Sequence, residues 1–262
     1  METRDIRKTA AEMYNPAIVG ITNTDVKIVP VPPEKRWQDP KRAHIYAAIC
    51  ASLQYQFWYS DSNTRLDGIN SQWINDTVKE ELDHCNVAIE NLKPLLIDRL
   101  MQSNIPKLKE RLNSLDEIFS VDLDLYGHYH NSTKTSMRIL AELPSFRQDP
   151  FFKKGVFAIM FSDRLSGKGY SDVPVPADYQ IPKILEGLDI ISYSSELKGI
   201  IDNDIVIPMN SKYEVAIRAA TILACDKLAE YNNISTNEVD LWLFSQKDTF
   251  IGKHHLCDTI NY

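Results

Sequence analysis

Apolar residues recur at helical spacing along most of this chain. In residues 43–59 they repeat every three or four positions with no glycine or proline between them, which predicts a mostly buried helix. Residues 71–120 show the same spacing with charged opposite faces and predict two or three amphipathic helices. The apolar segment 151–165 and the long pattern 213–231 each predict one more helix. The pattern therefore favours a mainly helical fold.

Residues that begin helices mark two further elements. Pro182 suits the first turn of a helix over residues 182–188, and this places Asp178 in the turn just before that helix. Ser235 and Glu238 have the spacing of a capping box and predict a helix that runs to about residue 245.

The domain organisation follows from what interrupts these patterns. Residues 1–42 are less regular, and we find no internal repeat or linker that would divide the chain. With 9 glycines in 262 residues, about half the usual share, the chain also lacks glycine-rich phosphate loops. We predict one mainly α-helical domain over residues 1–262, with little or no sheet.

Charge and cysteine content narrow the possible functions. The net charge is 29 − 36 = −7, which argues against binding of long DNA or RNA, because such binding neutralises phosphates with basic side chains. No apolar run approaches the ~18 residues that span a bilayer. The cysteines have no metal or disulfide spacing and are predicted to be reduced thiols of a cytoplasmic protein; they are Cys50, Cys85, Cys225 and Cys257.

Three groups of residues are candidates for chemistry. Asp178 could be a reactive carboxylate, or it could simply stabilise a helix N-terminus. Asp240 and Phe244 share one helix face and could hold a guanine-like base by hydrogen bonds and stacking, although such a pair can also be incidental. His128 and His130 have no third ligand beside them, so we predict no metal site.

An ordered set of motifs resembles the queuosine 5′-phosphate N-glycosylase/hydrolase family, also called the queuosine salvage proteins. The resemblance covers roughly residues 43–262. Its motifs are Gln56-Phe-Trp58, Leu143-Pro-Ser-Phe-Arg147, Phe151-Phe-Lys-Lys154, Ala177-Asp-Tyr-Gln-Ile-Pro182, Tyr193-Ser, Glu214-Val-Ala-Ile-Arg218, Asp240 to Phe244 and His255 to Tyr262.

The resemblance implies a helical fold similar to helix-hairpin-helix DNA glycosylases and release of queuine from queuosine 5′-monophosphate, for salvage into tRNA modification. It makes Asp178 the catalytic aspartate and places Asp240 and Phe244 at the base. The candidate phosphate-binding cations are Lys153, Lys154, Arg218 and His255. Further candidate substrate-binding residues are Phe57, Trp58, Tyr179, Glu214 and Ser245.

Alternatives stay open for several of these residues. Arg218 could pair with Glu214 one turn earlier, and the two lysines could lie at the surface. Leu256 and Asp258 stand where the family has arginines. Queuosine without a phosphate is therefore the second candidate substrate.

A fixed carboxylate suits cleavage of an N-glycosidic bond, because positive charge develops on the sugar in the transition state. A 7-deazaguanine has no N7 to protonate, so contacts to its pyrimidine edge must contribute more. This chemistry needs no metal or redox cofactor. The predicted partners are a small nucleotide or nucleoside and the queuine product, with no nucleic-acid polymer and no membrane. A non-catalytic binder of such nucleosides and a glycosylase acting on another modified nucleotide, or on DNA or RNA, are the alternatives.

Overall fold

The computed structural model describes residues 3–32, 36–59, 67–84 and 89–262. Short strands form two pairs in these ranges, and helices make up most of the remaining regular structure. The helices are α1 (Thr3–Met13), α2 (Pro40–Leu53), α3 (Ser71–His84), the 3₁₀ helix η1 (Ile89–Asn91), α4 (Leu92–Gln102), α5 (Leu108–Ile118), α6 (Leu123–His128), α7 (Thr133–Leu140), α8 (Pro144–Arg147), α9 (Lys153–Ser166), α10 (Gln180–Gly187), α11 (Ser195–Asp202), α12 (Lys212–Asn232) and α13 (Thr236–Ser245). The strands are β1 (Val19–Ile21), β2 (Ile191–Tyr193), β3 (Val206–Ile207) and β4 (Leu256–Cys257).

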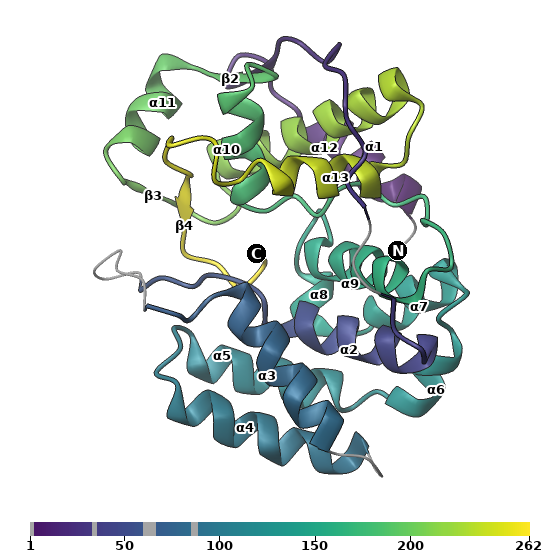
Figure 1. The fold of residues 1–262 in the computed structure, drawn as a ribbon. Helices are drawn as coiled ribbons and strands as arrows, with labels where there is room; N and C mark the ends of the chain where they lie inside the picture. Colours follow the sequence, from purple (N-terminus) through teal and green to yellow (C-terminus); the bar gives the residue numbers. More distant parts are fainter. Residues whose placement is uncertain (1–2, 33–35, 60–66, 85–88) are drawn as a thin grey trace.

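Helices α2 and α9 pack against each other at the centre of the fold (Figure 1). In the view of Figure 1, α3 and α5 lie to the left of this pair and extend below it, α4 lies below it, and α10 to α13 lie above it. The carboxylate of Asp39 caps α2 by accepting hydrogen bonds from the backbone nitrogens of Lys41 and Arg42, at 2.9 and 3.2 Å. All α2 side chains from Ala43 to Leu53 are buried. The predicted mainly helical fold is confirmed.

Helix α9 begins at a tightly packed turn. Phe152, the residue before the helix, has a φ of 50°, in the left-handed region that non-glycine residues adopt rarely. Its ring lies directly over Gly155, where a Cβ atom would come within 1.9 Å of the ring. Glycine at this position therefore allows the turn that sets the direction of Lys153 and Lys154.

The other long helices follow the sequence patterns closely. Helices α9 and α12 occupy the predicted segments, and α10 begins two residues after Asp178. Helix α13 has the predicted capping box, in which Ser235 and Glu238 exchange side-chain and backbone hydrogen bonds. Local spacing and capping residues were sufficient to locate these elements.

Two predictions of local structure were wrong. The helix expected over residues 43–59 begins at Pro40 and ends at Leu53, because the guanidinium of Arg111 binds the carbonyl oxygens of Tyr55 and Gln56 and holds them outside the helix. The less regular segment 1–42 contains α1, which packs against α12.

The strands connect distant parts of the chain. Strands β1 and β2 are antiparallel, with Val19 opposite Tyr193 and Ile21 opposite Ile191. Strands β3 and β4 are parallel and hold the C-terminal segment beside the chain that follows α11. The expectation of little sheet is confirmed by these short pairs.

Two sequence-based expectations concern compartment and membrane. The thiols of Cys50, Cys225 and Cys257 are free, and Cys85 lies outside the described residues. Within the described ranges, none of the helices combines the length and the hydropathy that crossing a bilayer requires.

Candidate active site

Asp178 lies where a buried extended segment meets the first turn of α10. The preceding side chains Val175 and Ala177 are fully buried, whereas Asp178 itself is half-buried. Its Oδ1 accepts hydrogen bonds from the backbone nitrogens of Gln180 and Ile181, at 2.8 and 3.2 Å. The role at a helix N-terminus is therefore present, but it uses one oxygen. No described residue donates a hydrogen bond to Oδ2.

The charges around Asp178 come from two other helices. Burial raises the pKa of Asp178 above its usual value, the positive charge of Lys153 opposes this, and the negative charge of Asp240 adds to it. Burial also lowers the pKa of Lys153, whereas the negative charge of Asp178 raises it. Lys153 is the first residue of α9, and its Nζ donates to the carbonyl oxygen of Gln54 at 3.0 Å. The fold thus brings these three charged side chains within electrostatic reach of one another.

Helix α13 carries the two predicted base contacts. The Asp240 side chain is buried, and Phe244, one turn later, is 43% exposed with Nζ of Lys247 4.5 Å from its ring centroid. A buried carboxylate one helical turn from an accessible aromatic ring can accept hydrogen bonds from a planar base while the aromatic ring stacks on the base.

Arg164 was not identified from the sequence. Its Nη2 donates to Oδ2 of Asp240 at 2.5 Å, and its Nε donates to Oδ1 of Asn237 at 2.6 Å. The signal that could have found it is the charged pair Asp163–Arg164 at the end of the apolar run in segment 151–165. A buried arginine in such a helix requires an anionic partner.

Each nitrogen of the Arg218 guanidinium donates a hydrogen bond to a protein group. It donates to Oδ2 of Asp149 at 2.7 Å, to Oε1 of Glu214 at 3.0 Å and to the carbonyl oxygen of Ala177 at 3.0 Å. All three charged side chains are at most 1% exposed. The alternative that Arg218 pairs with Glu214 is thus the arrangement found, and neither side chain is open to a phosphate.

Arg218 connects the two segments that carry the site. Through the carbonyl oxygen of Ala177 it holds the residue before Asp178. Through Asp149, whose carboxylate accepts from the backbone nitrogen of Lys153 at 2.8 Å, it holds the first turn of α9. Its position therefore fixes Asp178 and Lys153 relative to each other.

Burial disfavours the charged form of two of the candidate cations. His255 is buried, and burial lowers its pKa to about 3, so the imidazole is neutral near pH 7. Lys154 is 1% exposed rather than at the surface, its Nζ has no hydrogen-bond partner among the described residues, and burial lowers its pKa to about 7. Burial penalises the imidazolium ion, which argues against His255 as a charged phosphate ligand; its place at the substrate stays a prediction.

The remaining candidates differ in exposure. Phe57 and Trp58 are buried, at 5% and 2% exposure. Tyr179 is half-buried, with its ring centroid 4.7 Å from that of His254. Ser245 is exposed, and its hydroxyl donates to the carbonyl oxygen of Trp242 at 2.6 Å. Among these residues Tyr179 is the one next to Asp178 in the sequence.

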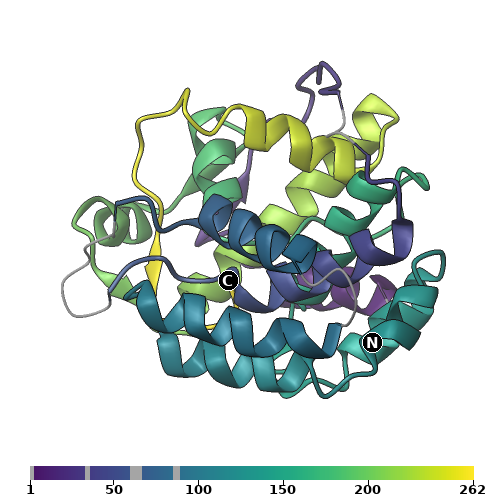
Figure 2. The same ribbon diagram turned by 60° about the horizontal axis from the view of Figure 1, so that its bottom comes forward.

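The C-terminal segment closes one side of this region. The carbonyl oxygen of Tyr262 accepts from the backbone nitrogen of Gln56 at 3.1 Å, and Oε1 of Gln56 accepts from the backbone nitrogen of Thr259 at 2.9 Å. Figure 2 shows the C-terminus beside the group of helices α3 to α5. Asp258, at a position where the family has arginine, forms an ion pair with Lys107.

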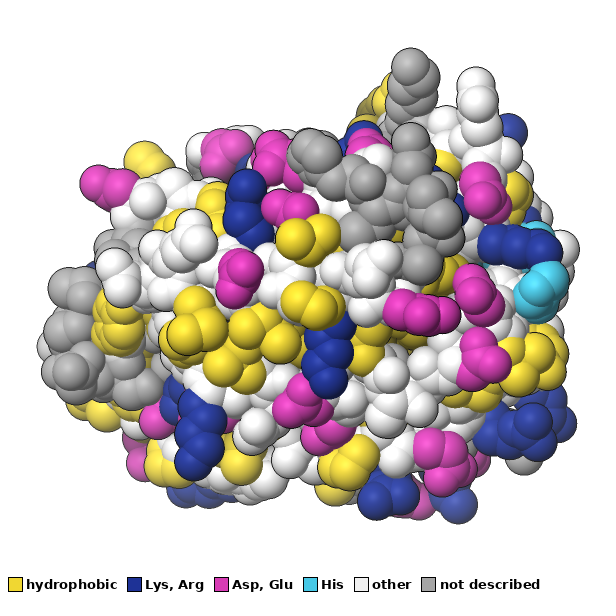
Figure 3. Space-filling model, turned by 90° about the horizontal axis from the view of Figure 1, so that it is seen from below, with side chains coloured by type: hydrophobic (Ala, Val, Ile, Leu, Met, Phe, Trp, Pro, Cys, Tyr) yellow, Lys and Arg dark blue, Asp and Glu magenta, His cyan; other side chains and the backbone are white. Residues whose placement is uncertain are grey.

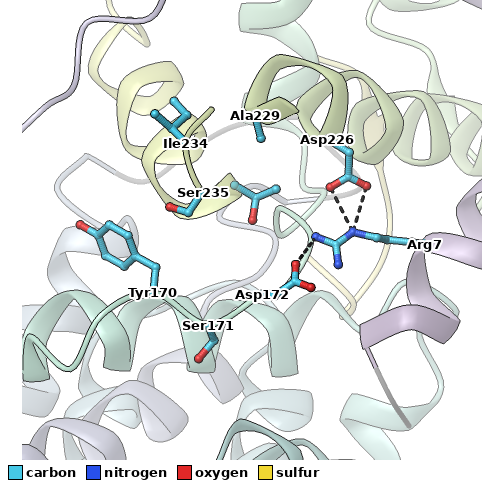
Figure 4. Close-up of a pocket in the computed structure, with 9 residues that line it drawn as sticks. Arg7, Tyr170, Ser171, Asp172, Asp226, Ala229, Ile234 and Ser235 are labelled. Atoms are coloured by element: carbon cyan, nitrogen blue, oxygen red, sulfur yellow. Dashed lines mark hydrogen bonds and ion pairs between the residues drawn. The ribbon is translucent and has the colours of Figure 1, made fainter. Parts of the chain in front are cut away.

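A cavity of about 430 Å³ lies elsewhere, between α1, α12 and the start of α13 (Figure 4). There the Nε of Arg7 lies 3.1 Å from both carboxylate oxygens of Asp226, and its Nη2 lies 2.9 Å from Asp172. Neither Asp178 nor Asp240 is among its lining residues. Its charged groups are paired with one another, so it is not our candidate active site.

Comparison with known proteins identifies similar sequences. The sequence model of the family described as queuosine salvage protein matches residues 168–255. The queuosine 5′-phosphate N-glycosylase/hydrolase of Dictyostelium discoideum is 38% identical over 94 residues, which are 33% of this chain and 29% of that protein. The protein of the same name from Schizosaccharomyces pombe is 26% identical over 169 residues, 55% of this chain and 48% of that protein.

The chain thus spans less than half the length of either of these curated relatives in the matched regions. The segment that the family's sequence model matches includes both Asp178 and Asp240. The resemblance predicted from the motifs is confirmed: the chain is related to the queuosine salvage proteins.

Proposed function

We propose that the protein hydrolyses the N-glycosidic bond of queuosine 5′-monophosphate or queuosine and releases queuine. The observation that carries this proposal is the half-buried Asp178, which has one oxygen bound to the start of α10 and the other without a described donor. The names of the two curated relatives support the same reaction.

The carboxylate of Asp178 acts on the sugar. As the bond to the base breaks, positive charge develops on the sugar ring, and a fixed carboxylate stabilises it, captures it covalently or orients the attacking water. The two backbone N–H groups that bind Oδ1 keep the carboxylate from rotating. The charge of Lys153 favours its ionised form against the effect of burial.

Asp240 and Phe244 bind the base. An ionised carboxylate accepts hydrogen bonds from the ring N–H and the exocyclic amine of a 7-deazaguanine, and the exposed ring of Phe244 stacks on its face. Replacement of Asp240 by Ala is expected to weaken binding of free queuine, which calorimetry can measure. Unchanged affinity in that variant would contradict the assignment.

Queuosine without its phosphate is the second candidate substrate, and a specific observation favours it. Arg218 is enclosed by protein partners, His255 is neutral and Lys154 is buried. Of the four cations considered for the phosphate, Lys153 is the one whose positive charge lowers the pKa of Asp178. Measurement of kcat/KM for queuosine and for its 5′-monophosphate distinguishes the two substrates.

A polymeric substrate is disfavoured by charge. The chain has a net charge of −7, and Figure 3 shows basic and acidic side chains interspersed around a band of hydrophobic ones on the face seen from below. A small substrate needs no extended basic surface. The cytoplasmic location stays a prediction.

The direct test is incubation of the protein with queuosine and with its 5′-monophosphate, followed by detection of free queuine by mass spectrometry. Release from either compound that is lost in Asp178→Asn supports the proposal. Tight binding of queuine with no release from either compound would instead identify a binding protein that uses the same site.

A further inference from the structure

Arg164 joins α9 to α13 at the residue proposed to bind the base. The Arg164 and Asp240 side chains are each 8% exposed. Nη2 of Arg164 donates to Oδ2 of Asp240, and its Nε donates to Oδ1 of Asn237, one turn before Asp240. Nδ2 of Asn237 in turn donates to the carbonyl oxygen of Met160 at 3.1 Å. The guanidinium thus holds Asp240 within a closed set of hydrogen bonds between the two helices.

The pairing leaves part of the Asp240 carboxylate unused. An ionised carboxylate has about four acceptor positions, two on each oxygen. Arg164 occupies one position on Oδ2, and no described residue donates to Oδ1. The free positions include both oxygens, which is the arrangement that a bidentate pair of donors requires.

Helix geometry places Arg164 on the same face of α9 as Lys153. The two residues are eleven positions apart, which is close to three full turns of an α-helix. One cation is therefore paired with Asp240, and the other acts on Asp178, to which it is electrostatically coupled. Of the two carboxylates, Asp240 is the one neutralised by a direct contact.

We propose that Arg164 is a specificity-determining positioning residue that fixes Asp240 as an acceptor for two adjacent donors on the base. This rests on the proposed function. Arg164 restrains the carboxylate by a direct hydrogen bond, so the site prefers a base edge with a ring N–H next to an exocyclic amine. A base that lacks the amine leaves one acceptor of a buried carboxylate without a partner, which is costly.

The test compares two free bases, 7-deazaguanine and 7-deazahypoxanthine, which lacks the exocyclic amine. Their dissociation constants are measured by calorimetry for the wild-type protein, Arg164→Lys and Arg164→Gln. We expect the wild type to prefer 7-deazaguanine by about tenfold or more. We expect Arg164→Gln to lose most of that preference and Arg164→Lys, which keeps a cation, to recover part of it.

Kinetics provide a readout that a merely structural role would not change. In Arg164→Gln we expect KM for the nucleoside to rise about tenfold while kcat changes less, because Asp178 is untouched. Arg99→Gln is the matched control, since Arg99 pairs with Glu80 at the surface of the α3–α4 pair. It should leave both the base preference and KM unchanged.

Loss of Arg164 leaves a buried carboxylate unpaired and can prevent folding. The double variant Arg164→Met/Asp240→Asn removes both charges and keeps the protein testable, with the thermal midpoint as the check on folding. In this variant the preference for 7-deazaguanine should also be lost.

The outcomes separate this inference from the proposed function. A folded Arg164→Gln protein that keeps the wild-type preference and KM would overturn the inference and leave the function standing. A wild-type protein that binds no 7-deazaguanine and releases no queuine would overturn the function, and with it this inference.

Discussion

Two groups of charged side chains lie beside α9, and they differ in whether their polar atoms already have partners within the protein. In the first, Arg218 donates to Asp149, to Glu214 and to a backbone carbonyl, and all three side chains are sealed from solvent. In the second, Asp178 and Asp240 each keep an oxygen without a described donor.

This difference indicates a structural role for the Arg218 cluster, whereas Asp178 and Asp240 can bind a substrate. A buried ion pair with every partner present has nothing left to offer a substrate, although removing one member is severe. Carboxylates that keep free acceptors next to partly exposed residues can bind a substrate. The motif that ends at Arg218 thus holds the surrounding segments in place, and Asp178 is the residue that we propose as catalytic.

The largest expected effect tests the first cluster, in which Arg218 pairs with Asp149 and Glu214. Replacement of Arg218 by Met leaves Asp149 and Glu214 buried without their cation, so the free energy of unfolding should fall by about 3–5 kcal/mol. Urea unfolding followed by circular dichroism measures this. Lys8→Met is the control, because the exposed Lys8–Glu12 pair should contribute less than about 0.5 kcal/mol. A similar small loss in Arg218→Met would refute the scaffold role.

The next effect concerns catalysis at Asp178, in the second cluster. Asp178→Asn should reduce kcat by about 10³-fold, because the amide cannot stabilise positive charge on the sugar. Its oxygen can still accept from the first turn of α10, so the fold should be kept. Asp178→Ala loses this cap and should also lose about 1 kcal/mol of stability. Appreciable turnover in Asp178→Asn would remove this residue from the mechanism.

The same variant has an expected pH dependence. The pKa of Asp178 is raised in the folded state, mainly by burial, so its ionised form destabilises the fold. Asp178→Asn should therefore be at least as stable as the wild type at pH 7. This advantage should shrink as the pH falls from the raised pKa towards the ordinary value of 3.8, which thermal unfolding across that range can check.

A smaller effect is expected at Phe244, the exposed aromatic residue one turn after Asp240. Phe244→Ala should weaken binding of 7-deazaguanine by about 1–3 kcal/mol through loss of stacking. The thermal midpoint should change little, because the ring is 43% exposed. Tyr231→Ala is closely matched, since Tyr231 is also 43% exposed and also has a lysine 4.5 Å from its ring centroid. Equal affinities in the two variants would contradict the stacking role.

The smallest effect on activity is expected at Lys154. Its pKa is lowered to about 7 by burial, so the unfolded chain binds more protons than the folded one between pH 7 and the ordinary value of 10.5. Wild-type stability should therefore rise with pH over this interval, and Lys154→Met should be more stable at pH 7 by about 1 kcal/mol. The variant's advantage should decrease towards pH 10, with turnover kept. Loss of substrate affinity in Lys154→Met would restore the residue to the phosphate site.

The sequence by itself determined the elements that depend on local interactions. The capping box of α13, the apolar pattern of α9 and the turn before α10 require only residues a few positions apart. These elements contain Asp240, Lys153 and Asp178, and the motifs that resemble a known family singled out the same positions.

Only the tertiary structure decided where α2 ends and which charges are available. Arg111, more than fifty residues away, holds Gln56 outside the helix, and burial leaves His255 neutral. Arg164 meets Asp240 across 76 positions of sequence. Such pairings and pKa shifts depend on which surfaces pack together, and local periodicity does not specify that packing.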